Sequence, residues 1–126
     1  LPGVPLIRPA LPPPETDLEA AEASCARLAE AGLERLYLTH FGVVDEVEEH
    51  LAAVVRRNAA WGAEVAAGMD AGEDHETLVR RMRRLEDQEL DQAGVTGPRR
   101  EAYKLSSDAR MTVLGLERYW RKRDQP

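Results

Sequence analysis

A short apolar run, Leu-Tyr-Leu-Thr-His-Phe-Gly at residues 36–42, constrains the fold more than any other part of the sequence. Leu36 and Leu38 fall on one face of an extended segment and Tyr37 falls on the other, and such residues suit a pleated surface. The run therefore predicts a β-strand, the one convincing strand of the chain. Because a single strand cannot satisfy its own backbone groups, we expect its partner strands to come from elsewhere.

His40 lies where the predicted strand stops, two residues before Gly42, which can adopt backbone conformations closed to other residues. A helix-start signal follows at Asp45. Proteins of the α/β class place ligands and metals at such strand ends, and a neutral imidazole can bind a cation. Taken alone, however, a histidine at the end of a strand is more often a hydrogen-bonded structural residue than a ligand.

The order of elements adds weight to the metal interpretation of His40. A proline-rich lead-in, an Asp-led helix, a strand ending Leu-Thr-His-Phe-Gly and a long Trp-bearing helix resemble the C-terminal part of metallo-β-lactamase-fold hydrolases. The resemblance covers residues 7–61 and, near the end, residues 115–120. In that family the last metal ligand is a histidine at the end of a late strand, and His40 matches it.

The resemblance implies an α+β fragment that is mostly α, with one α-β unit from the edge of an αββα fold. About three helices follow this unit. We accordingly divide the chain into residues 1–42, the C-terminal α-β portion of a metallo-β-lactamase-like domain, and residues 43–126, a helical C-terminal region. The family's His-x-His-x-Asp-His cluster is missing, and the three histidines here, His40, His50 and His75, are not at ligand spacing. The remaining metal ligands are therefore expected outside this chain.

By resemblance, the full-length enzyme would be a metallo-hydrolase that binds two metal ions, commonly zinc, and uses a bridging hydroxide as nucleophile. A metal ion lowers the pKa of bound water to about 7, so hydroxide is available at neutral pH. His40 would bind one metal, and the following helices would wall a cleft for a small ester, thioester or lactone. Phe41 and Trp61 are candidates to line this cleft, and packing in the core explains them equally well. The fragment alone is expected to be inactive, because one histidine cannot hold a catalytic metal tightly.

A non-catalytic helical interaction or dimerisation module is the alternative, and it requires no missing residues. It rests on an apolar seam in the second predicted helix and on the aromatic tail at Tyr119 and Trp120, which together offer a surface for a homodimer. The sequence upstream of Leu1 would discriminate between the two functions. The seam residues recur at steps of three and four: Val47, Leu51, Val54, Asn58, Trp61 and Val65.

Composition limits the partners. Lys and Arg number 17 against 23 Asp and Glu, giving a net charge of −6, which argues against nucleic-acid binding. No apolar run approaches the roughly 20 residues of a membrane span, so a cytoplasmic location is the expectation. The single Cys25 cannot form an internal disulfide and is expected to be buried and inert.

The first part of the chain predicts a surface connector followed by a helix. Residues 1–14 hold six of the eight prolines, which favours an extended segment. We expect it to run along a domain surface, with a proline-rich ligand for a partner's aromatic groove as the alternative. The first helix opens at residues 16–19 and stops at Gly32, and its stripe should cover the predicted sheet as core: Leu18, Ala21, Cys25 and Leu28.

Three further helices are predicted after the strand. One runs from residue 43 to about residue 69, with His50 partly exposed beside its seam. The next is capped by Asp74 and carries His75 as a solvated residue. The last starts near Pro98, is interrupted near residues 106–108, and packs Tyr119 and Trp120 close to Trp61. In the middle helix, acids that follow the arginine cluster are expected to neutralise it: Arg80, Arg81, Arg83 and Arg84.

Overall fold

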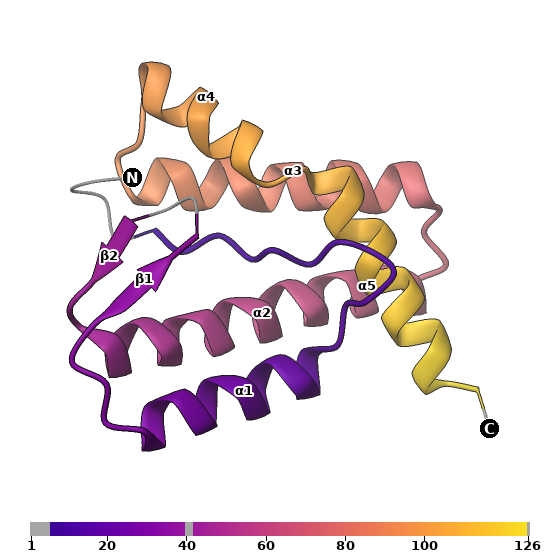
Figure 1. Ribbon diagram of the computed structural model, residues 1–126. Helices are drawn as coiled ribbons and strands as arrows, with labels where there is room; N and C mark the ends of the chain where they lie inside the picture. The colour runs from indigo at the N-terminus through magenta and orange to yellow at the C-terminus, as the bar shows by residue number, and fades with distance from the viewer. Residues whose placement is uncertain (1–5, 40–41, 126) are drawn as a thin grey trace.

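The computed structural model describes residues 6–39 and 42–125 of the chain. Within these ranges the protein is mostly helical, with one small two-stranded antiparallel sheet (Figure 1), so the mostly-α prediction is confirmed. No helix in this part of the chain has the length and apolar character needed to cross a membrane. In chain order the elements are α1 (Leu18–Glu30), β1 (Leu36–Leu38), β2 (Gly42–Val44), α2 (Val47–Asp70), α3 (His75–Gln92), α4 (Gly97–Ser106) and α5 (Ala109–Arg123).

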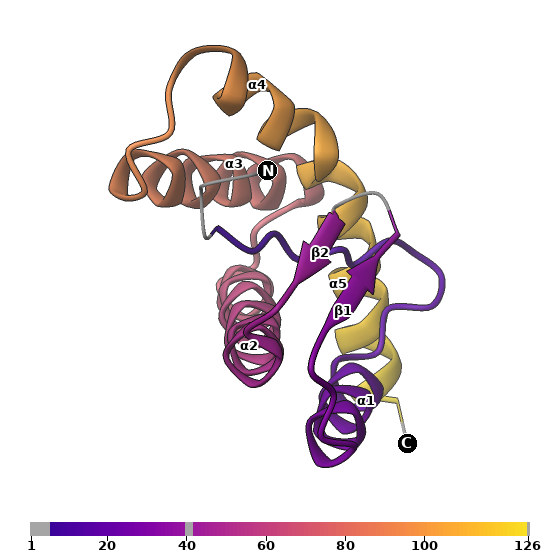
Figure 2. The ribbon, with the colours of Figure 1, turned by 60° about the vertical axis from the view of Figure 1, so that its left-hand side comes forward.

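The long helix α2 supplies the centre of the core. The predicted seam faces inward: Leu51, Asn58, Trp61 and Val65 are buried and Val54 is half-buried. Helix α3 returns alongside α2, and α5 crosses both helices (Figures 1 and 2). Burying side chains from all three helices is the main source of stability in a helical assembly of this kind. The main core cluster comprises Leu11, Trp61, Val65, Leu78, Val79, Met82, Ala109, Val113 and Leu116.

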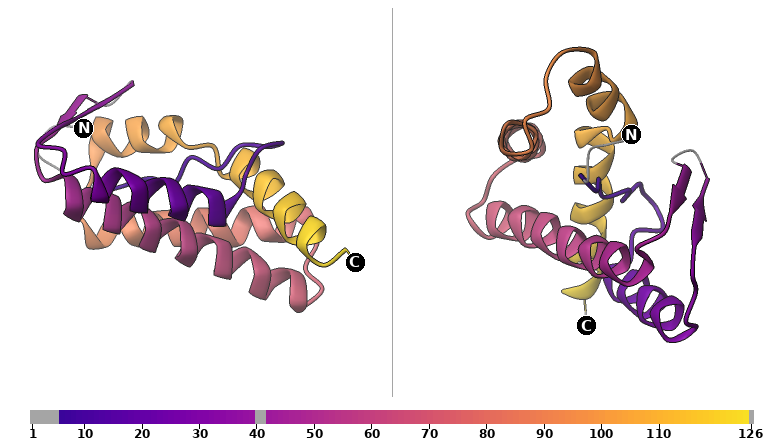
Figure 3. Two further views of the ribbon diagram at one scale, coloured as in Figure 1. Left: turned by 60° about the horizontal axis from the view of Figure 1, so that its bottom comes forward. Right: turned by 90° about the vertical axis from the view of Figure 1, so that its left-hand side faces the viewer.

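An extended segment, residues 6–16, runs through the helical region, and we call it the strap. It lies between α2 and α3 before the chain turns back into α1 (Figures 1 and 3). Leu11 belongs to the main core cluster, and Leu6 packs with Leu90, Val95 and Tyr103 in a second one. The prediction of a connector laid along the surface is therefore wrong for this segment, because its apolar side chains complete the core between the helices.

The strap approaches α5 most closely at Gly115. A Cβ atom at this position would collide with the backbone carbonyl oxygen of Leu11 and with the side chain of Thr16. Only a residue without a side chain lets the two backbones lie this close. The glycine at position 115 therefore allows the strap to pack directly against α5.

The second helix begins at Val47, so its predicted start at residue 43 is wrong. Residues 43–44 instead form β2 and pair with β1, in keeping with the preference of β-branched valine for strands. Asp45, the predicted N-cap, forms a 2.5 Å ion pair with Arg35 across the base of the hairpin. Glu46 takes the cap position and makes no side-chain capping bond.

Helix α1 packs along α2, and none of its residues is fully buried. Within its predicted core stripe, Leu18 and Cys25 are half-buried, whereas Leu28 is exposed. The expectation of a buried stripe over the sheet is therefore wrong for the part of the chain that the structure covers. Partial burial raises the pKa of the Cys25 thiol, which favours its protonated, unreactive form.

At the start of α3, the predicted cap at Asp74 is confirmed, whereas the prediction for His75 is wrong. Asp74 caps the helix by accepting a 2.8 Å hydrogen bond from the backbone N–H of Thr77, as expected. The prediction of a solvated His75 is wrong, because its Nδ1 atom lies 2.6 Å from Oε2 of Glu117. Helix α5 crosses at this point and brings the buried Glu117 carboxylate to the first turn of α3.

The sequence predicts that the arginines of α3 are neutralised by the acids that follow them, and this prediction is wrong. Arg81 instead pairs with Glu73, which precedes the helix. The later acids pair with other elements: Glu86 with Arg8 of the strap, and Asp87 with basic side chains of α4. Arg80, Arg83 and Arg84 are exposed, whereas the later acids tie α3 to its neighbours.

The C-terminal part contains two helices where one interrupted helix was predicted. Four helices thus follow the hairpin in the described ranges, against about three expected. Pro98 lies in the first turn of α4, and Asp108 caps α5 by accepting a 2.9 Å hydrogen bond from the N–H of Arg110. The predicted packing of the aromatic tail is confirmed, since Trp120 Nε1 donates to the Gly62 carbonyl at 3.0 Å.

Two glycine substitutions test the close approach of the strap to α5. Gly115→Ala and Gly62→Ala should each gain about 1 kcal/mol of helix propensity. A Cβ at Gly115 meets backbone of the strap, whereas one at Gly62 chiefly meets the movable end of the Leu18 side chain. We expect Gly115→Ala to be less stable than Gly62→Ala by about 2 kcal/mol in urea unfolding. Equal stabilities would show that the strap does not hold α5.

Candidate functional site

The predicted metal ligand lies between the two strands of the hairpin in sequence. In the hairpin, Leu36 pairs with Val44, Tyr37 with Val43 and Leu38 with Gly42. The sequence-predicted strand is therefore present, although its regular part is short. His40 and Phe41 fall outside the described residues, so the assignment of His40 as a ligand stays a prediction.

One carboxylate near the hairpin is already engaged. Arg35 Nε donates to Oδ1 of Asp45 at 2.5 Å, and hydrogen bonds to Asp45 and then to Tyr37 raise the pKa of this exposed guanidinium. A carboxylate neutralised by an arginine is a poor candidate for binding a cation as well. Asp45 therefore serves to close the base of the hairpin.

The other two histidines lie apart from each other. His50 is in the first turns of α2 and half-buried, and its burial lowers its pKa, so it is neutral at pH 7. His75 begins α3, beyond the opposite end of α2, and is held by Glu117. No group of three or more His, Cys, Asp or Glu side chains that could hold a metal ion occurs among residues 6–39 and 42–125.

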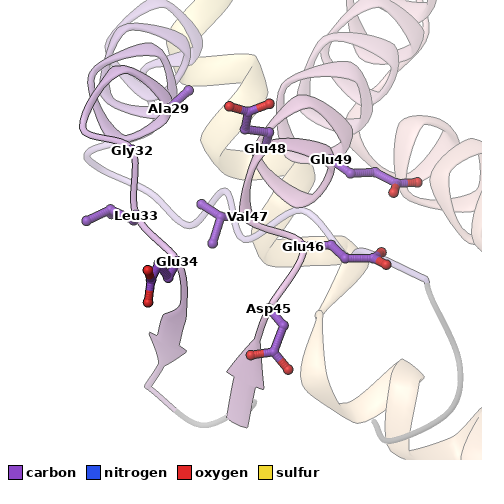
Figure 4. Close-up of a pocket in the computed structure, with 9 residues that line it drawn as sticks. All are labelled: Ala29, Gly32, Leu33, Glu34, Asp45, Glu46, Val47, Glu48 and Glu49. Atoms are coloured by element: carbon purple, nitrogen blue, oxygen red, sulfur yellow. The ribbon is translucent and has the colours of Figure 1, made fainter.

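A hollow of about 460 Å³ lies beside the base of the hairpin, between the end of α1 and the start of α2. Its lining is rich in carboxylates, but these do not converge on one point: Glu46 and Glu49 extend to one side, and the others extend in different directions (Figure 4). Divergent carboxylates cannot share a cation, because binding a divalent ion needs several oxygens at one point. The five acids are Glu34, Asp45, Glu46, Glu48 and Glu49.

A buried ionic cluster beneath the strap was not anticipated from the sequence. The side chains of Arg8 and Glu86 are only 7% and 5% exposed, and they form an ion pair. The Arg8 guanidinium also lies 5.0 Å from the ring centroid of Trp61, within reach of a cation–π interaction. Trp61 Nε1 in turn donates to Oε1 of Glu89 at 3.1 Å, and Arg57 pairs with the same oxygen at 2.5 Å.

The sequence does carry a signal for this cluster. Leu78, Met82, Glu86 and Leu90 recur every four residues and therefore share one face of α3. A carboxylate in such an apolar row must be buried, and a buried charge needs a partner. Arg8 is the single basic residue of the strap, and it is the partner of this carboxylate.

Burial makes the ionised form of Glu86 costly. Desolvation raises the pKa of this carboxyl above its usual 4.5, and the Arg8 guanidinium offsets only part of the rise. A raised pKa in the folded state means that Glu86 favours folding most below pH 4.5, and loses that contribution as the pH rises through the higher value. Among the described residues, two Arg8 nitrogens, Nε and Nη1, also have no hydrogen-bond partner. The pair thus specifies where the strap lies rather than supplying net stability.

No protein-family model, curated protein or solved structure matches the chain.

A double-mutant cycle tests the energetics of the buried pair. Arg8→Met or Glu86→Leu alone should each cost about 3–5 kcal/mol, because each leaves a buried charge without its partner. The double variant should lie within about 1 kcal/mol of the wild type or above it. Urea unfolding measures all four proteins. For comparison, the exposed pair Arg110 and Glu76 should show a coupling below about 1 kcal/mol.

If Arg8→Met and Glu86→Leu acted independently, so that the double variant lost the sum of both effects, the pair would not be coupled. That result would contradict the buried ion pair by which Glu86 holds the strap.

Proposed function

We propose that this chain is the C-terminal segment of a metal-dependent hydrolase of the metallo-β-lactamase superfamily. In this proposal His40 contributes one ligand to a site of two zinc ions, and the helices wall the active site. The substrate class is a small ester, thioester or lactone. The residues that support the proposal are the run Leu-Thr-His-Phe-Gly and the proline-rich lead-in and helix before it.

The observation that carries the proposal is the open hairpin. The described ranges hold no third strand beside β1 or β2, so the outer edge of each strand lacks a sheet partner there. Tyr37 and Val43, which form a cross-strand pair, are 75% and 53% exposed. An isolated two-stranded sheet is marginal in water, and open edges invite pairing with further strands. A larger sheet that includes β1 and β2 would satisfy both requirements.

Helix α1 points to the same conclusion. It packs mainly along α2, buries none of its residues fully, and leaves Leu28 and, just beyond the helix, Leu33 exposed. A layer of sheet beside α1 would cover these side chains. Figure 3 shows the hairpin standing beside the helices rather than between them, so one of its sides remains open to such a layer.

The described residues do not fit a metal site by themselves, as the separated histidines and divergent carboxylates indicate. The proposal therefore places the remaining ligands in other parts of the full-length polypeptide. We derive no reaction step from the residues of this chain.

Metal analysis of the full-length polypeptide tests the role of His40. The wild type should hold two zinc equivalents, and His40→Ala should lose at least one of them, because a missing imidazole removes a bond that no neighbour replaces. His50→Ala is the matched control and should retain both. Equal zinc content in the wild type and His40→Ala would remove His40 from the site.

A second function, a non-catalytic helical interaction or dimerisation module, is favoured by one observation. Three apolar side chains of α4 and α5, Leu105, Met111 and Leu114, are exposed, and Leu105 is 86% exposed. Exposed apolar side chains that gather on one face mark interaction surfaces. The helical region also has a buried core of its own, which a module requires.

Sedimentation of the chain at increasing concentration tests the module. A dimer through α4 and α5 should be weakened at least about tenfold by Leu105→Ser, since a buried Leu contributes roughly 1.5–3 kcal/mol. Leu28→Ser, on the exposed side of α1, should leave the dimer unchanged. A chain that stays monomeric at all concentrations would argue against this function.

A further inference from the structure

A second hollow, of about 490 Å³, lies where the start of α1 and the end of α5 meet α2, and we call it the α1–α5 hollow. Its floor on α2 consists of small apolar side chains, among them Ala59, Ala63 and Ala66, and Trp120 of α5 forms a wall. Figure 1 shows α1 running antiparallel to α2, with the C-terminal part of α5 beside the start of α1. Mostly apolar hollows of roughly 300–1,000 Å³ are typical of small-molecule sites.

One polar side chain in the α1–α5 hollow has no partner. Asn58 lines the hollow from α2 and is 9% exposed. Within the described ranges, the Asn58 side chain makes no hydrogen bond. A buried amide without a partner is costly, because its hydration is largely lost and not replaced. A ligand that forms a hydrogen bond with this amide inside the hollow would offset that cost.

A carboxylate lies beside Asn58 in the hollow. A Cβ atom at Gly62 would meet the end of the Leu18 side chain, so these two residues are neighbours across the α1–α2 contact. Because the two helices are antiparallel, one turn further along α1 and one turn back along α2 bring Glu22 next to Asn58. Both side chains line the hollow. In the part of the chain that the structure describes, Glu22 makes no ion pair.

The same end of α5 already holds one cation against a neighbouring carboxylate. Arg123 pairs with Glu19, which also lines the hollow. Its guanidinium carbon lies 5.7 Å from the ring centroid of Tyr119 and 5.8 Å from that of Trp120. The Trp120 ring is fixed by the hydrogen bond that its Nε1 donates to the backbone of α2. Carboxylates beside aromatic rings are favourable surroundings for organic cations.

We propose that the α1–α5 hollow binds a small organic amine, whose ammonium group lies between the Glu22 carboxylate and the Asn58 side-chain oxygen. The apolar body of the amine lies on the alanines of α2 and against the ring of Trp120. The ammonium group supplies the donor that the Asn58 oxygen needs and the charge that complements Glu22. This site does not rest on the hydrolase proposal, because it uses no residue of the hairpin and no metal ligand.

Titration with phenethylamine tests the site, because this probe is an ammonium group joined to an apolar ring. In nitrogen–proton correlation NMR spectra of the chain, the indole N–H signal of Trp120 should shift. The signal of Trp61, which is buried in the core, should stay in place. Amines of this size should bind with a dissociation constant of roughly 0.1–1 mM. Phenylacetate, which has a carboxylate in place of the aminomethyl group, should produce no shift.

Variants of the two polar residues test where the ammonium group lies. Asn58→Leu preserves the approximate size of the side chain and removes the acceptor, so the dissociation constant should rise at least about tenfold. Glu22→Gln removes the charge at an exposed position of α1 and should raise the dissociation constant at least about threefold. Glu30→Gln is the matched control: it makes the same charge change on α1 outside the hollow and should leave the dissociation constant unchanged.

Three results would overturn the proposal. The first is no shift of the Trp120 signal with phenethylamine. The second is a phenylacetate shift equal to that of phenethylamine, since the site would then not recognise the positive charge. The third is a dissociation constant in Glu22→Gln or in folded Asn58→Leu that equals the wild-type value. If Asn58→Leu does not fold, Glu22→Gln alone decides, because its side chain is exposed and takes no part in the core.

Discussion

The burial of the strap between α2 and α3 is the constraint on which the rest of the structure depends. It brings Arg8 to Glu86 and Leu11 into the core cluster, and it fixes Gly115 of α5 against its backbone. The helical region is closed on itself as a consequence. The same packing directs the chain out at residues 12–16, which places α1 along α2 and leaves the hairpin beyond the helices (Figure 1).

The protein therefore consists of two parts that differ in how much of their apolar surface is buried. The helical region buries Trp61, Val65, Met82 and their neighbours and pairs several of its charges between helices. Helix α1 and the hairpin bury little, and they expose Tyr37, Val43 and Leu28. A difference of this kind is expected if the second part belongs to a larger sheet, as it would in the proposed hydrolase.

Sequence patterns predicted the features that depend on neighbouring residues. The seam of α2, the Asp74 cap, Pro98 at the start of α4 and the strand at residues 36–38 all follow from local periodicity or capping chemistry. The predictions that were wrong concern residues whose surroundings are set by other elements of the structure. Val43 joined β2 because β1 was there to pair with it, and His75 met a carboxylate that α5 supplied.

The ionic cluster under the strap illustrates the same limit. The position of Glu86 in the apolar row of α3 indicates a buried charge. Its partner, Arg8, lies 78 residues earlier, in a segment whose prolines predict a surface connector. For the candidate metal site, the sequence supplied His40 and its family resemblance. The described residues add the open hairpin and the engagement of Asp45 by Arg35.

Hydrogen exchange of the backbone amides of β1 and β2 tests most directly whether the hairpin is part of a larger sheet. In this chain alone, these amides should exchange almost as fast as in an unfolded peptide, while the amides of α2 and α3 are protected. In the full-length polypeptide, the hairpin amides should slow by at least about a hundredfold, because further strands would pair with their edges. Hairpin amides that are as protected in the chain alone as in the full-length polypeptide would contradict the proposed sheet.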